Sequence, residues 1–169
     1  MKNDILIRLI NANDSMEELT ELLHRAYAAH AAAGMNFTAA DQDADETRRR
    51  IAIGEPYVAE LNHRIVGTII LRAPGVLTYG IPYFEKPGVA YFAQFAVDPD
   101  YQKHGIGSRL VEFVERRAAE LKIPELALDT AEPAAELIAW YDRRGYKPVD
   151  ITQWPGKTYR SVILSKKLA

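Results

Sequence analysis

The stretch QKHGIGSRLVEFVERRA, residues 102–118, combines a glycine-rich turn with the start of a long amphipathic helix. Leu110, Val114, Ala118 and Leu121 fall at helical spacing and predict a stripe that faces the core. Glycines at such a turn let the backbone approach a ligand closely. The first N–H groups of a helix lack intrahelical partners and lie at the positive end of its dipole. The stretch therefore predicts a helix start that binds an anion such as phosphate.

The segments on either side of this turn indicate a mixed α/β chain with a strand–helix–strand crossover in its second half. Hydrophobic spacing and turn residues predict strands at 5–10, 57–61, 65–71, 90–97 and 126–131, a closing hairpin over 147–154 and 158–168, and helices that start near 16, 45, 105 and 134. Residues 73–90 carry three prolines and three glycines, which predicts an irregular connection.

Length and composition predict one domain over residues 1–169 and exclude several kinds of protein. The net charge of −2 provides no basic surface for nucleic acid, and no apolar run reaches the roughly 20 residues of a membrane span. The chain has no cysteine and no signal peptide at its start, so a cytoplasmic location is expected. The acidic run 41–46 lacks the glycine of a calcium loop, and no metal is expected.

Three phosphate-binding patterns compete for the glycine turn. A P-loop requires Gly-Lys-Ser/Thr, but Gly107 is followed by Ser108 and Arg109. A dinucleotide-binding turn requires a third glycine where this chain has Leu110. The pattern Gln/Arg-x-x-Gly-x-Gly/Ala is met in full by residues 102–107.

With this pattern the chain resembles the GNAT family of N-acetyltransferases. The resemblance covers FAVDPDYQKHGIGSRLVEFVE, residues 95–115, and LIAWYDRRGY, residues 137–146, in the family's order and on the expected elements. It implies a mixed, mostly antiparallel central sheet flanked by helices. It also implies acetyl-CoA as the acyl donor.

The resemblance implies two sets of backbone contacts to acetyl-CoA. N–H groups of the turn 102–108 would hold the pyrophosphate, and free groups of the preceding strand would pair with pantetheine. Lys103, His104 and Arg109 could add positive charge. The residues implied to bind the cofactor are Phe95, Ala96, Val97, Gln102, Lys103, His104, Gly105, Ile106, Gly107 and Ser108.

The resemblance also implies a general acid. Tyr141 aligns with the family tyrosine that faces the CoA sulfur, and a phenol with a pKa of about 10 is protonated at neutral pH. The general base stays open, since the strand 90–97 offers Gln94 and no carboxylate. The other candidates are Asp129, Glu85 and His30. Ala134 stands where relatives often carry an asparagine that contacts the cofactor.

The acceptor implied by the resemblance is a primary amine of a small molecule or peptide. The segments 28–45 and 73–90 are expected to surround it with aromatic side chains and a carboxylate, drawn from Asn36, Phe37, Tyr79, Tyr83, Phe84 and Glu85. The alternative is a non-catalytic CoA-binding or regulatory domain on the same fold. Homodimers are common among such relatives, although no interface can be located in the sequence.

Overall fold

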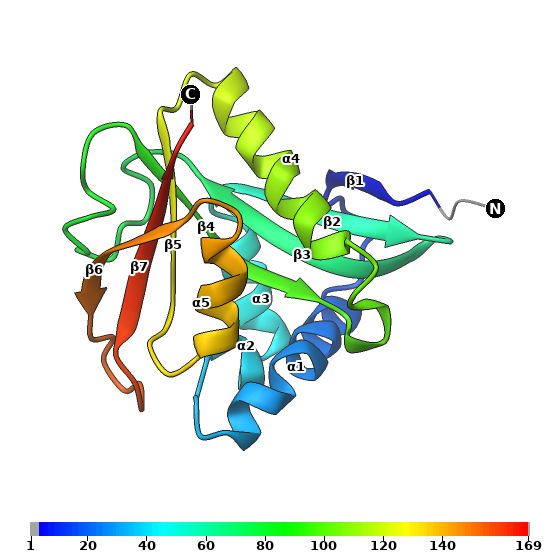
Figure 1. The fold of residues 1–169 in the computed structure, drawn as a ribbon. Coiled ribbons are helices and arrows are strands. Elements are labelled where there is room, and N and C mark those ends of the chain that lie inside the picture. The colour runs from blue at the N-terminus through cyan, green and yellow to red at the C-terminus, as the bar shows by residue number, and fades with distance from the viewer. Residues whose placement is uncertain (1–3, 169) are drawn as a thin grey trace.

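The computed structural model describes residues 4–168, and the seven strands in that range form one sheet in the order β1-β2-β3-β4-β5-β7-β6 (Figure 1). The strands are β1 (Leu6–Leu9), β2 (Glu55–Leu61), β3 (Arg64–Arg72), β4 (Val89–Val97), β5 (Glu125–Ala131), β6 (Lys147–Thr152) and β7 (Ser161–Lys167). The helices are α1 (Met16–Ala32), α2 (Thr38–Asp41), α3 (Ala44–Ile51), α4 (Ile106–Glu120) and α5 (Ala135–Asp142), with a short 3₁₀ turn at Pro99–Tyr101. No helix within the described range is long and apolar enough to cross a membrane.

Strand pairing confirms the mixed, mostly antiparallel sheet. Every pair of neighbouring strands is antiparallel except β4 and β5, which are parallel and joined through α4. This β4–α4–β5 unit is the predicted crossover. Asn62 and His63 turn β2 into β3 with positive φ angles of 50° and 62°, as a tight hairpin requires.

The helices cover both faces of the sheet (Figure 1). The main core lies between the sheet and α4 and includes the predicted Leu110, Val114 and Ala118. Leu121 was expected in the same stripe, but it is 41% exposed because α4 ends at Glu120 and Leu121 lies beyond the last helical turn. A second cluster packs α1 and α2 against Ala96 on the opposite face.

One short helix differs from the predicted elements, and the predicted irregular connection is confirmed. The helix α2 was not predicted, because it is only four residues long and has no side-chain cap at its start. Residues 73–88 form no strand, in line with the proline and glycine content of this connection. This connection nevertheless contributes a buried cluster of its own, with Ile81 and Phe84 packed against Val89 and Tyr91 of β4.

Candidate active site

The parallel strands β4 and β5 separate part-way along their length. They pair only between Val89–Tyr91 and Glu125–Ala127, so the rest of β4 has no strand beside it on that side within the described chain. In Figure 1, α5 lies in front of the place where the two strands diverge. Backbone groups inside a protein require hydrogen-bond partners, so this opening can receive an extended ligand.

A bulge in β4 lies at the same opening. Ile70 pairs with Ala93 and Thr68 with Ala96, so two residues of β4, Gln94 and Phe95, stand opposite one of β3. Gln94 has a φ of 51°, and the carbonyl of Phe95 accepts a hydrogen bond from the Tyr27 hydroxyl at 2.7 Å. Bulges are frequent next to active sites because they change the direction of a strand's backbone groups.

The start of α4 has the geometry expected of an anion site. Its N-cap, Gly105, has a φ of 77° and supplies no side-chain hydrogen bond to the helix. A Cβ added at Gly105 would meet no atom within 4 Å, so the space before the helix is open. The first intrahelical bond is donated by Arg109 to Gly105, which leaves the N–H groups before Arg109 for a ligand. These features fit a CoA pyrophosphate.

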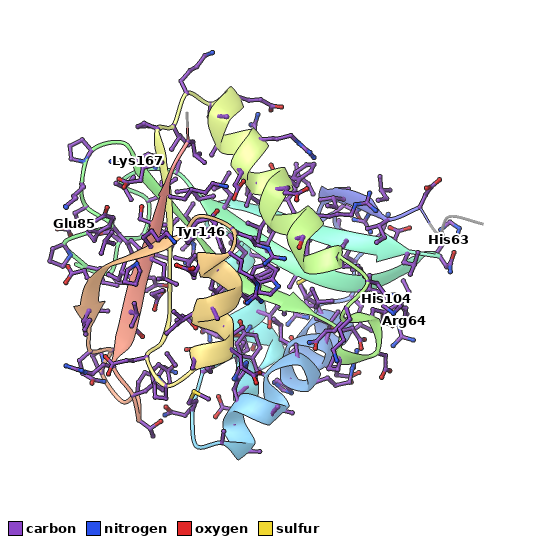
Figure 2. All side chains as sticks on the ribbon, viewed as in Figure 1. His63, Arg64, Glu85, His104, Tyr146 and Lys167 are labelled. Carbon is purple, nitrogen blue, oxygen red and sulfur yellow. The ribbon has the colours of Figure 1, made fainter. Side chains whose placement is uncertain are left out.

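The other residues implied to bind the cofactor surround this helix start. Gly107 packs closely, since a Cβ there would lie 3.2 Å from Phe95 and 3.5 Å from Trp140. The side chain of Gln102 donates to the Val97 carbonyl at 3.2 Å. Lys103 and His104 are exposed before α4, where Figure 2 labels His104.

Arg144 connects the start of α4 to α5 and was not singled out from the sequence. Its guanidinium donates to Ser108 Oγ at 2.5 Å and to the Trp140 carbonyl at 2.9 Å. The group also lies over the Trp140 ring at 3.3 Å. The sequence signal was its position within LIAWYDRRGY, but only the fold brings it to Ser108.

Tyr141 lies on α5 and faces the β4 side of the opening. Its side chain is 5% exposed, and its ring lies 6.1 Å from Phe92 and 6.4 Å from Phe95. Burial raises the pKa of Tyr141 well above its ordinary value, so the phenol holds its proton at neutral pH. Tyr27 lies nearby, because its hydroxyl donates to the carbonyl of Phe95, whose ring neighbours that of Tyr141.

Asp129 lies on β5, opposite the free part of β4. Burial raises the pKa of its carboxyl group above the ordinary value, while a hydrogen bond from Trp154 at 2.8 Å and the charge of Arg50 offset part of that rise. The residue as a whole is half-buried. A carboxylate with a raised pKa is better matched to proton abstraction than an ordinary aspartate.

The other base candidates have different surroundings. Gln94 is buried and bonded to Gln42 at 3.0 Å, and an amide cannot take up a proton at neutral pH. Glu85 is exposed, is bonded to Thr78, and lies in a loop far from His104 at the start of α4 (Figure 2). His30 packs on the rings of Tyr27 and Phe37, and burial lowers its pKa.

The aromatic residues expected around the acceptor fall into two groups. Phe37 lies 5.2 Å from both Tyr27 and Tyr159, and Tyr79 lies 5.0 Å from Trp154, the partner of Asp129. Tyr83 and Phe84 instead belong to the core, because Tyr83 donates to buried Glu125 and Phe84 stacks on Tyr91. Asn36 bonds to Gly156 and Thr158 of the β6–β7 loop.

Comparison with known proteins identifies the family. The model of the acetyltransferase (GNAT) family matches residues 16–146, which is most of the chain. The chain belongs to the GNAT acetyltransferase family. It is therefore an acyltransferase, and the predicted family resemblance is confirmed.

Two curated relatives come from Bacillus subtilis (strain 168). An S-(2-succino)cysteine N-acetyltransferase is 38% identical over 154 residues, with 90% of each chain covered. An S-alkylcysteine N-acetyltransferase is 28% identical over 148 residues, which are 86% of this chain and 80% of the relative.

Solved structures share the fold. A GNAT family acetyltransferase from Elizabethkingia anophelis, with acetyl-CoA bound, superposes with a TM-score of 0.71 at 19% identity and covers 99% of this chain and 100% of its own. A second, PH1933 from Pyrococcus horikoshii OT3, has a TM-score of 0.74 at 20% identity, with 98% and 99% covered. The GNAT acetyltransferase fold is thus shown for this chain.

Proposed function

We propose that this GNAT acetyltransferase transfers an acetyl group from acetyl-CoA to the α-amine of a small S-substituted cysteine. The observation that carries the proposal is the opening between β4 and β5, with Tyr141 on one side and Asp129 on the other. The choice of acceptor is supported by the relative that acts on S-(2-succino)cysteine, at 38% identity over nine-tenths of both chains.

The donor would lie along β4 and over the start of α4. The free N–H groups of the first turn of α4 would bind the pyrophosphate, helped by Lys103 and His104. Backbone groups of Ala96 and Val97 would pair with the pantetheine. The carbonyl of Phe95 already accepts a hydrogen bond from the Tyr27 hydroxyl, so we assign it to holding the bulge and not to binding the pantetheine.

Asp129 would act as the general base and Tyr141 as the general acid. The ammonium form of the amine loses a proton to the Asp129 carboxylate. The nitrogen then attacks the thioester carbonyl carbon, a C–N bond forms and the C–S bond breaks. Tyr141 donates its proton to the departing thiolate and is reprotonated by the second proton released from the acylated nitrogen, while the amide N–H of Val97 would polarise the carbonyl oxygen.

The test is acetylation of S-methylcysteine by the purified protein, followed as free thiol and as product mass. We expect thiol release that depends on the acceptor, and none with N-acetyl-S-methylcysteine, whose amine is blocked. Lysine and a short peptide serve as competing acceptors. Acetylation of the peptide or of lysine, with none of any S-substituted cysteine, would refute the choice of acceptor while leaving the acetyltransferase activity.

A further inference from the structure

Arg50, in the last turn of α3, presents a guanidinium that pairs with no carboxylate within residues 4–168. Its only side-chain hydrogen bond there is from Nη1 to Gln42 Oε1 at 2.7 Å. A guanidinium carries five N–H donors, so most of its donors remain available. Arg50 is half-buried, and a charge removed from water without a partner is costly. Such a group suits an anionic ligand.

The amide of Gln42 holds this guanidinium in place. The Gln42 nitrogen donates to Thr47 Oγ1 at 2.8 Å and to Gln94 Oε1 at 3.0 Å. Because the nitrogen is used in both bonds, the oxygen of Gln42 faces Arg50. The Gln42 side chain is buried, so this orientation is maintained by the surrounding structure. Gln94 Nε2 is a further buried donor without a partner in the same network.

Two other cations lie near Arg50, together with the carboxylate of Glu46, which Arg49 already binds. Arg72 is fully buried and donates to the Arg50 carbonyl at 3.2 Å, and it too pairs with no carboxylate in the described chain. Burial lowers the pKa of Arg50, and the charge of Arg72 lowers it further. Burial lowers the pKa of Lys157, the charge of Asp41 offsets part of that shift, and the charge of Arg50 lowers the pKa further. A negatively charged ligand would relieve this repulsion.

Asp129 lies on β5 two residues beyond Ala127, the partner of Tyr91 on β4. The Tyr91 hydroxyl accepts from Arg72, whose guanidinium also donates to the Arg50 carbonyl. The carboxylate of Asp129 and the unused N–H donors of Arg50 therefore lie on the same side of the sheet, beside the β4–β5 opening. An amino acid carries the complementary pair, an ammonium and a carboxylate. With its ammonium at Asp129, its carboxylate is the group left for Arg50.

We propose that Arg50, held by Gln42, is the carboxylate-binding residue for the acceptor. The inference rests on the proposed function and adds the group that selects an acidic acceptor over a neutral one. A guanidinium binds a carboxylate through two parallel N–H donors, which a lysine ammonium cannot reproduce. The carboxylate is either the α-carboxylate or one on the sulfur substituent, and the experiment separates the two.

The experiment compares three acceptors: S-methylcysteine, its α-carboxamide and S-(2-succino)cysteine. Two matched pairs are compared: S-methylcysteine with its α-carboxamide, and S-(2-succino)cysteine with S-methylcysteine. For the wild-type protein, kcat/KM in at least one pair should be at least tenfold higher for the acceptor with the additional carboxylate. In Arg50→Gln this preference should be lost. The KM for the acceptor with the additional carboxylate should rise, while the KM for its matched acceptor should change little. Arg49→Gln, an exposed neighbour on the same helix that pairs with Glu46, is the matched control and should keep the preference.

The two sources of the carboxylate give different results. Loss of the preference for S-methylcysteine over its carboxamide assigns Arg50 to the α-carboxylate. Loss only of the preference for S-(2-succino)cysteine over S-methylcysteine assigns it to the substituent. Arg50→Lys keeps the charge without the paired donors and should give an intermediate preference, which provides the answer if Arg50→Gln does not fold.

Other outcomes would overturn the inference. Equal use of the acids and the carboxamide by the wild-type protein would refute the carboxylate site while leaving the proposed function intact. An equal loss toward acids and carboxamide in Arg50→Gln and Arg50→Lys would assign Arg50 a structural role. Failure of the wild-type protein to acetylate any of the three would refute the proposed function itself, and the inference with it.

Discussion

At the scale of single residues, Tyr141 can be tested by removing one oxygen atom. Tyr141→Phe keeps the ring contacts with Phe92 and Phe95 and removes only the hydroxyl. We expect turnover to fall by about 100-fold or more, the usual contribution of a general acid. Acetyl-CoA affinity, measured by calorimetry, should be nearly unchanged. Unaltered turnover would mean that another group protonates the thiolate.

Asp129→Asn should lower the activity of the protein but not its stability. Burial raises the pKa of Asp129 in the folded state, so the ionised form costs stability that grows as pH rises through that pKa. Asp129→Asn removes this cost and keeps an oxygen for Trp154. The variant should unfold at the same or a higher temperature at neutral pH, and match the wild type near pH 4.

The same variant tests the catalytic role of Asp129. Turnover should fall by about 100-fold, the order expected for loss of a general base. The acidic limb of the kcat/KM profile should also disappear, because the titrating carboxyl group is gone. A variant that keeps full activity, or that keeps the acidic limb, would return the base to the open candidates.

At the scale of elements, the start of α4 depends on the left-handed conformation of Gly105. Gly105→Ala places a Cβ in the open space before the helix and costs about 1–2 kcal/mol of stability. We expect acetyl-CoA to bind about tenfold more weakly, since the turn must shift to relieve the strain.

Gly34→Ala is the matched control for this change. Gly34 has a φ of 88°, also has no atom within 4 Å of an added Cβ, and lies beyond the end of α1. The control should lose similar stability and keep its acetyl-CoA affinity. Equal affinity losses in the two variants would show that the effect follows from strain and not from the α4 site.

At the scale of the whole molecule, acetyl-CoA should stabilise the fold. The two parts of the sheet are joined between β4 and β5 by only three residue pairs, and a ligand in the opening adds contacts there. At 100 times its Kd, a ligand of the native state adds about 2.7 kcal/mol, which raises the unfolding temperature by about 5–10 °C. CoA should act like acetyl-CoA, while ATP and NAD at the same concentration should not. A larger shift with ATP or NAD would contradict the assignment of the α4 turn to CoA.

Several expected properties of the chain stay predictions. The single domain over residues 1–169, the cytoplasmic location and a homodimer are not tested by the fold or by the relatives. The roles of individual residues at the α4 turn and of Tyr141 also await the variants above. The family and the mixed, mostly antiparallel sheet are confirmed.

The sequence by itself determined the elements whose signals are local. The turn before α4, the stripe of Leu110, Val114 and Ala118, and the position of Tyr141 on α5 depend on spacing within one segment. Periodicity and turn chemistry act over a few residues, so they can be recognised without knowledge of the rest of the chain. The exposed Leu121 shows the limit of such patterns at a helix end, where one residue decides whether a side chain lies inside or outside.

Only the tertiary structure decided which polar groups meet at the opening. Tyr27, Arg50 and Asp129 come from α1, α3 and β5, far apart in sequence, and no local pattern marks them as neighbours. Their proximity follows from the separation of β4 from β5 and from packing of α1–α3 on one face of the sheet. Such contacts depend on how distant segments pack, which is why local patterns left the general base open and gave no sign of Arg50.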